Sequence, residues 1–171
     1  MSGLISLGIL MSVLLLAGGY AISTYNRLID VQQLVDSQWD RMDLALKQKS
    51  RSIPELLDLA GDGGFHERVL LNRVRDALED YRKARYPADG IRAASELVQA
   101  MEHFLSAADQ YPSLRANGRF QELRRSYQHR EKGDLRPFFN ETVGHYNRLV
   151  STFPSSLVAE LFRFETWPVF R

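Results

Sequence analysis

The chain has no cysteine and almost no excess of charge of either sign. Of its 171 residues, 22 are Lys or Arg and 21 are Asp or Glu, which leaves a formal charge of +1. The missing cysteines exclude disulfide bonds, thiol nucleophiles, iron–sulfur clusters and cysteine-bound zinc, and they leave the redox compartment open. The balanced charge provides no global field for nucleic acids or acidic ligands. We therefore expect no nucleic-acid partner.

Motifs for catalysis and phosphate binding are also missing. Gly61-Asp62-Gly63-Gly64 lacks the Lys-Ser/Thr pair and the preceding strand of a phosphate loop. His66-Glu67 and Glu102-His103 are neighbours in sequence, so on a helix the two side chains of each pair diverge and cannot chelate one ion. His66 and His103 could still meet across two helices, and such a shared site is the arrangement that would fit a hydrolase role. Three carboxylates at helical spacing are interpreted as surface charge: Asp36, Asp40 and Asp43. We expect a non-enzyme without catalytic residues, metal, cofactor or evident small-molecule substrate.

The longest apolar run is Leu4–Ile22, in which Tyr20 is the one ionisable side chain. As a helix it would rise about 28 Å, close to the ~30 Å hydrocarbon thickness of a bilayer. It predicts a membrane anchor over residues 1–24, followed by one domain over residues 25–171. A signal peptide cleaved after Ala21 is the alternative, but no Lys or Arg precedes the run, and the run exceeds the ~7–15 residues usual for a signal core.

The basic residues that flank the apolar run bear on its orientation. Arg27 and, more distantly, Arg41 follow it, whereas no basic residue precedes it. Because Lys and Arg collect on the cytoplasmic side of a span, this pattern favours a single-pass protein with a cytoplasmic body.

After the apolar run, hydrophobic residues recur at spacings of three and four, which is typical of amphipathic helices. No Gly or Pro lies between Gly19 and Pro54, so the anchor helix can continue to about Arg51, and Ser52 suits the N-cap of a new helix. Further helices are expected over about 65–86, 91–108, 114–130 and 138–150, with a short helical turn over 157–162 and an extended tail.

Turn residues are expected to separate these helices. Pro87-Ala88-Asp89-Gly90 should end the helix over 65–86, and Gly133 and Pro137 should break the chain before residue 138. The side of the 65–86 helix that we expect to be buried consists of Val69, Leu70, Val74, Ala77, Leu78 and Tyr81. With no strand pattern of any length elsewhere, the sequence predicts an all-α fold, in which the transmembrane helix continues into an antiparallel four-helix bundle.

Two blocks of residues make the chain resemble the LemA family of membrane-anchored bacterial proteins. The first block is Tyr25-Asn26-Arg27-Leu28, Trp39, Met42, Leu46-Lys47, Ile53-Pro54, Leu56 and His66-Glu67. The second is Tyr111-Pro112, Leu114, Ala116-Asn117, Phe120, Leu123, Asn140, Val143, Tyr146-Asn147, Phe153-Pro154, Leu157, Ala159, Phe162 and Phe164. The resemblance implies a bacterial membrane protein with an amino-terminal transmembrane helix, a four-helix domain and no established enzymatic activity. His129, Lys132 and Phe139 depart from the family pattern, which predicts an irregular last helix.

Two groups of residues are candidates for interaction. The basic run from Arg115 to Arg136, interrupted by Glu122, Glu131 and Asp134, could contact anionic lipid or an acidic partner, or could be a solvated helical face. Its candidate residues are Arg119, Arg124, Arg125 and Arg130. The second group is Tyr25, Asn26, Tyr146 and Asn147. These residues could form a polar recognition site, but we favour hydrogen bonds between helices, because an asparagine within a helix must find partners.

The expected function is that of a non-enzymatic scaffold held in the membrane by Leu4–Ile22, which binds a membrane or envelope protein or a second copy of itself. The alternatives are sensing of anionic lipid by the basic run and an accessory role to an envelope hydrolase or protease.

Overall fold

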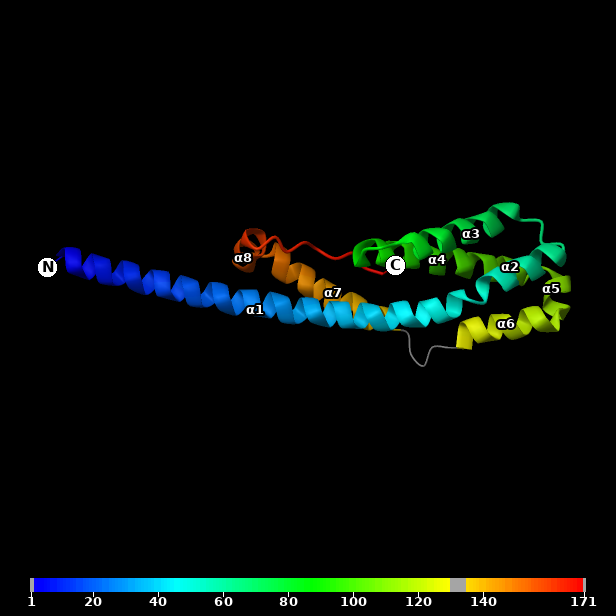
Figure 1. Ribbon diagram of the computed structural model, residues 1–171, viewed down its shortest axis with the longest axis horizontal. Helices are drawn as coiled ribbons and strands as arrows, with labels where there is room; N and C mark the ends of the chain where they lie inside the picture. The colour runs from blue at the N-terminus through cyan, green and yellow to red at the C-terminus, as the bar shows by residue number, and fades with distance from the viewer. Residues whose placement is uncertain (1, 130–134, 171) are drawn as a thin grey trace. The chain divides into compact units, whose positions relative to one another are not determined.

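The computed structural model describes residues 2–129 and 135–170, and within them all regular secondary structure is helical (Figure 1). The helices are α1 (Ser2–Ser50), α2 (Ile53–Asp62), α3 (Arg68–Lys83), α4 (Pro87–Ala108), α5 (Pro112–Ala116), α6 (Gly118–His129), α7 (Arg136–Ser151) and α8 (Ser155–Leu161). The expected all-α fold, with a long apolar first helix and further helices packed together, is confirmed.

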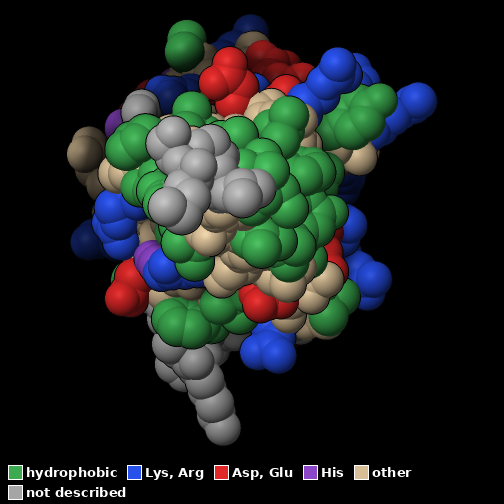
Figure 2. Space-filling view, turned by 90° about the vertical axis from the view of Figure 1, so that its left-hand side faces the viewer, with side chains coloured by type: hydrophobic (Ala, Val, Ile, Leu, Met, Phe, Trp, Pro, Cys, Tyr) green, Lys and Arg blue, Asp and Glu red, His purple; other side chains and the backbone are tan. Residues whose placement is uncertain are grey.

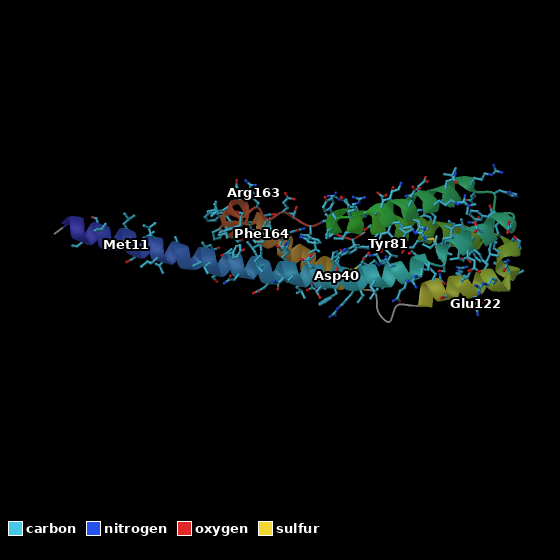
Figure 3. The ribbon with its side chains drawn as sticks, in the orientation of Figure 1. Met11, Asp40, Tyr81, Glu122, Arg163 and Phe164 are labelled. Atoms are coloured by element: carbon cyan, nitrogen blue, oxygen red, sulfur yellow. The ribbon has the colours of Figure 1, made fainter. Side chains whose placement is uncertain are left out.

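Helix α1 is continuous for 49 residues, as the absence of Gly and Pro after Gly19 predicts. In the described part of the chain it contains the one stretch that is long and apolar enough to cross a membrane, with a mean hydropathy of 2.1 and no burial. Side chains around Met11 project freely from this part of the helix (Figure 3). A signal sequence would share these properties, so cleavage after Ala21 stays an open alternative.

The chain divides into two compact units. One, called here the anchor unit, comprises Met1–Val35 and Glu141–Trp167; the other, the core unit, comprises Asp36–Asn140 and Pro168–Arg171. The predicted boundary between the membrane anchor (residues 1–24) and the following domain (residues 25–171) marks the edge of the membrane, and it stays a prediction.

The core unit is built around the packing of α3 against α4. An aromatic chain runs through it: the ring of Phe104 lies 5.5 Å from that of Phe65 and 6.3 Å from that of Phe120, both edge-on. The buried Tyr81 on α3 donates a hydrogen bond of 2.6 Å to Oδ1 of Asp43 on α1. Hydrophobic burial thus holds the helices together, and this partly buried polar contact joins α3 to the core-unit part of α1.

Helix α2 begins where Pro54 predicts a restart. Ser52 occupies the N-cap position, but its hydroxyl donates back to the carbonyl of Lys49 at 2.9 Å instead of capping α2. Pro54 lies in the first turn, where its missing N–H costs nothing.

The expected bounds of the helix over 65–86 are corrected, because α3 begins at Arg68 and ends at Lys83. Pro87-Ala88-Asp89-Gly90 does not end α3 but forms the first turn of α4. Proline suits this position because its φ is already helical, and it holds the preceding Tyr86 in an extended conformation.

The expected buried face of α3 is wrong at Val69, which is 80% exposed, and at Leu70, which is only half-buried. Leu71 is buried instead, and the buried stripe consists of Leu71, Val74, Ala77, Leu78 and Tyr81. Residues 69, 70 and 71 are all apolar, so hydrophobic periodicity alone leaves the rotation of the first turn undecided.

The helix expected over 114–130 is interrupted at Asn117, whose backbone is extended. Oδ1 of Asn117 accepts a hydrogen bond of 3.0 Å from the backbone N–H of Phe120, and the asparagine thereby acts as the N-cap of α6. The expected break at Gly133 lies outside the described residues. The expected break at Pro137 is wrong, because α7 begins at Arg136, two residues before the expected start, and Pro137 lies in its first turn.

In the anchor unit, residues of α1, α7 and the chain that follows α8 come together: Tyr25, Ile29, Tyr146, Phe162 and Trp167 line one pocket. The buried side chains of this unit include Leu28, Val35, Val143, Tyr146, Val158 and Ala159. Residues 162–167 contain no helix or strand, as expected for the tail.

Candidate functional site

The C-terminal tail is held by asparagine side chains of α7. In the anchor unit, Nδ2 of Asn147 donates to the carbonyl of Trp167 at 2.8 Å, and Oδ1 accepts from the N–H of the same residue at 2.8 Å. In the core unit, Asn140 makes the same pair of bonds with the backbone of Phe170, at 2.6 and 2.7 Å. Each amide thus satisfies both backbone polar groups of one tail residue. The sequence predicts hydrogen-bonding partners for Asn147, but the partner is the tail backbone and not a second helix.

The other three residues of this candidate group have different environments. The ring of Tyr25 packs on Phe162 at 4.7 Å and on Phe164 at 5.8 Å. Tyr146 is buried, whereas Asn26 is exposed. Their function in recognition stays a prediction.

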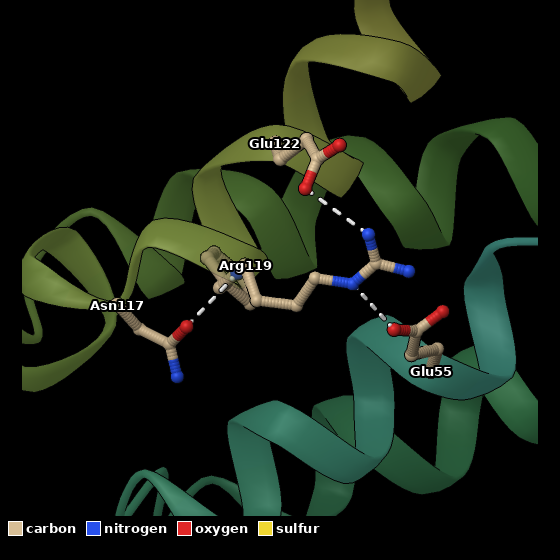
Figure 4. A network of polar contacts seen from close by, with 5 residues as sticks. Glu55, Asn117, Arg119 and Glu122 are labelled. Carbon is tan, nitrogen blue, oxygen red and sulfur yellow. Dashed lines mark hydrogen bonds and ion pairs between the residues drawn. The ribbon is translucent and has the colours of Figure 1, made fainter.

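Several arginines of the basic run are engaged in ion pairs. Nε of Arg119 lies 2.7 Å from Oε1 of Glu55 on α2, and its Nη1 lies 3.0 Å from Oε2 of Glu122 (Figure 4). Arg124 binds both carboxylate oxygens of Asp109, with one contact of 2.8 Å, and this hydrogen bonding lowers the pKa of Asp109.

The remaining basic candidates differ. Arg136 pairs with Glu102 at 3.3 Å, and Arg125 is exposed. Arg130 lies outside the described residues, as do Glu131, Lys132 and Asp134 of the same run. The described ion pairs connect α6 and α7 to α2 and α4, so much of this positive charge is offset within the core unit.

The acidic group on α1 has a structural role at one position. Asp43 accepts from Tyr81 and pairs with Lys47 at 2.6 Å. Burial and the nearby charge of Asp40 raise the pKa of Asp36. His66 and His103 are exposed, and the residues that the structure describes contain no group of three or more His, Cys, Asp or Glu that could hold a metal ion.

The core unit also contains a cavity of about 430 Å³, which sequence analysis missed. Its apolar lining comes from α1, α4, α6 and the tail and includes Trp39, Met42, Leu46, Leu105, Tyr127 and Phe170. Its charged lining consists of Lys49, Glu102, Asp109, Arg124 and Arg136. The ammonium of Lys49 lies 5.6 Å from the centre of the Tyr127 ring. Periodicity identifies which residues face inward, but not where the helices leave a space.

The fold and these sites define an all-α protein with a first helix able to cross a membrane, in which the best-defined polar contacts join helices to one another and to the tail. Residues 38–171 match the LemA family, and the chain belongs to this family. The resemblance inferred from the sequence is thereby confirmed. No curated protein matches the chain.

Proposed function

We propose that the protein is a non-enzymatic scaffold in a bacterial membrane, and that it binds another membrane or envelope protein, or a second copy of itself, through the cavity of the core unit. The observation that carries the proposal is the composition of this cavity. A lining that combines apolar and charged side chains suits a groove that accepts side chains of a partner helix.

The charged groups at the cavity favour binding over chemistry. Two of its arginines are paired with two of its carboxylates, Arg124 with Asp109 and Arg136 with Glu102. Such pairs orient a partner and exclude mismatched charge. None of the described lining residues is a histidine or cysteine, the usual general base or thiol nucleophile of an active site.

The anchor in this proposal is the first part of α1. Residues that would lie in the bilayer and residues packed in the anchor unit belong to one unbroken helix, so no flexible linker separates them. Arg27 and Arg41 on the carboxyl side of the apolar run support a cytoplasmic body.

The proposal is tested by photo-crosslinking of the full chain in its native membrane. A photoreactive residue replaces Ser106, an exposed residue of the cavity lining, and in a matched control it replaces the exposed Val69. We expect a discrete crosslinked product at position 106 and none at position 69. The product should disappear when Leu135→Asp places a charge in the lining, since Leu135 is 41% exposed and its replacement leaves the core intact.

Mass spectrometry of the product identifies the partner. A crosslink to an envelope hydrolase or protease would establish the accessory role. Equal products at both positions, or a product insensitive to Leu135→Asp, would contradict binding at the cavity. Sensing of anionic lipid by the basic run has less support, because Arg119, Arg124 and Arg136 are in ion pairs within the chain.

A further inference from the structure

Helix α8 and its flanking residues expose large apolar side chains. Leu157 and Leu161, which are one helical turn apart and therefore on one face, are 59% and 73% exposed. Phe153 before the helix and Phe162 after it are 74% and 51% exposed. Single exposed apolar residues are ordinary, but several large ones in one short segment indicate a surface that contacts an apolar phase or a partner.

Contacts within the anchor unit place this segment beside the end of the apolar run of α1. The ring of Phe162, the residue that follows α8, lies 4.7 Å from that of Tyr25 on α1. Tyr25 follows Ile22 by three residues, which is a rise of about 4.5 Å. The polar layer on each side of the hydrocarbon core is about 5–8 Å thick, so the level of Tyr25 falls within that layer when Leu4–Ile22 spans the bilayer.

The side chains at this level suit the interfacial layer. Tyr20 and Tyr25 lie on α1 on either side of Ile22, and Tyr is enriched at membrane interfaces. Arg163, the second residue after α8, is exposed (Figure 3). Glu160 and Glu165 are exposed as well. Since both signs of charge are present, apolar contact rather than attraction to anionic lipid would drive the interaction. The apolar side chains of α1 dominate the view from its amino end (Figure 2).

We propose that α8, with Phe153 and Phe162, inserts its exposed apolar side chains into the interfacial layer of the same bilayer that α1 spans. This second membrane contact limits rotation of the anchor unit about the axis of α1. The inference rests on the anchor of the proposed function. A few apolar side chains suffice to hold α8 at the bilayer, because the inserted α1 keeps α8 close to the membrane surface and so raises its effective concentration there.

The absence of cysteine permits a direct test with single-cysteine variants of the full chain in phosphatidylcholine vesicles. A fluorescent label at Leu161→Cys reports on α8, and one at Glu160→Cys reports on the neighbouring face of the same helix. Label at Val69→Cys is the aqueous reference, and label at Leu14→Cys reports insertion of the anchor. Each variant is measured with lipids that carry a shallow nitroxide, with lipids that carry a nitroxide deep in the acyl chain and, separately, with a water-soluble quencher. The deep nitroxide is needed for position 14, because Leu14 lies near the middle of the apolar run.

We expect label at position 161 to be quenched by the shallow nitroxide lipid, and labels at 160 and 69 mainly by the aqueous quencher. Leu157→Ser added to Leu161→Cys should lower the ratio of docked to undocked α8 about tenfold, the effect of removing one leucine from an apolar phase. Aqueous quenching at 161 equal to that at 69 would overturn the inference. Protection at 161 from both quenchers would also overturn it, because a protein would then cover α8. If label at position 14 is not quenched by lipid, the anchor itself is wrong.

Discussion

Replacing Asn147 with alanine tests whether the amide clamp holds the tail. The substitution removes two hydrogen bonds of 2.8 Å to the backbone of Trp167. At about 1 kcal/mol net for each bond, the loss is about 2 kcal/mol. The higher helix propensity of alanine stabilises α7 equally with the tail attached or detached, so it does not offset this loss. A cost of about 2 kcal/mol corresponds to about a thirtyfold increase in the ratio of detached to attached tail.

Hydrogen exchange of the full chain in detergent micelles, followed by mass spectrometry, measures this effect. Peptides that cover the tail around Trp167 should exchange about thirtyfold faster in Asn147→Ala, while peptides from α3 keep their rates. Asn26→Ala is the matched control, because Asn26 lies in α1 with its side chain exposed.

Asn147→Asp separates the two bonds. The carboxylate still accepts from the N–H of Trp167, but it cannot donate to the carbonyl and repels it. Exchange of the tail should be at least as fast as in the alanine variant. The clamp would be refuted if Asn147→Ala and Asn26→Ala gave the same exchange rates in the tail.

Three further substitutions are measured by denaturant unfolding of the full chain in micelles. Tyr81→Phe should destabilise by about 1–2 kcal/mol through loss of the bond to α1. Burial, and then the neighbouring carboxylate, raise the pKa of Tyr81, so the stability that its neutral phenol provides is complete below about pH 10 and is lost as the pH rises further. Arg124→Ala should cost roughly 1 kcal/mol. Because the pKa of Asp109 is lowered, the contribution of that ion pair is present above the ordinary carboxyl pKa of about 3.9 and is lost as the pH falls below it. Gly64→Ala should cost about 1–2 kcal/mol, because φ is 80°.

Each of these variants has a control or a contradicting result. If the stability of Tyr81→Phe declines above pH 10 as steeply as that of the unmodified protein, the decline comes from other titrating groups. Arg125→Ala, at an exposed neighbour of Arg124, should change stability by less than about 0.5 kcal/mol. Gly61→Ala should stabilise by up to about 1 kcal/mol, because a Cβ at this helical position has open space around it. A loss at Gly61 equal to that at Gly64 would contradict the conformational argument.

The sequence predicts only part of the candidate site. The need of Asn147 for hydrogen-bond partners follows from its helical position, but its partner is the backbone of Trp167, and any residue type could present the same backbone groups. Ion pairing of Arg119 with Glu55 joins residues far apart in sequence. The cavity depends on the spacing between packed helices, and no local stretch of sequence shows that spacing.

What the sequence determines by itself is what depends on neighbours along the chain: the continuity of α1, the restart near Pro54, the apolar run and the family. These follow from backbone sterics and hydrophobic periodicity. Tertiary structure decides the rotation of α3, where Leu71 and not Val69 is buried, and the attachment of the tail to α7. The reason is physical: three consecutive apolar residues or a polar helix side chain are compatible with several arrangements, and only packing against distant residues selects among them.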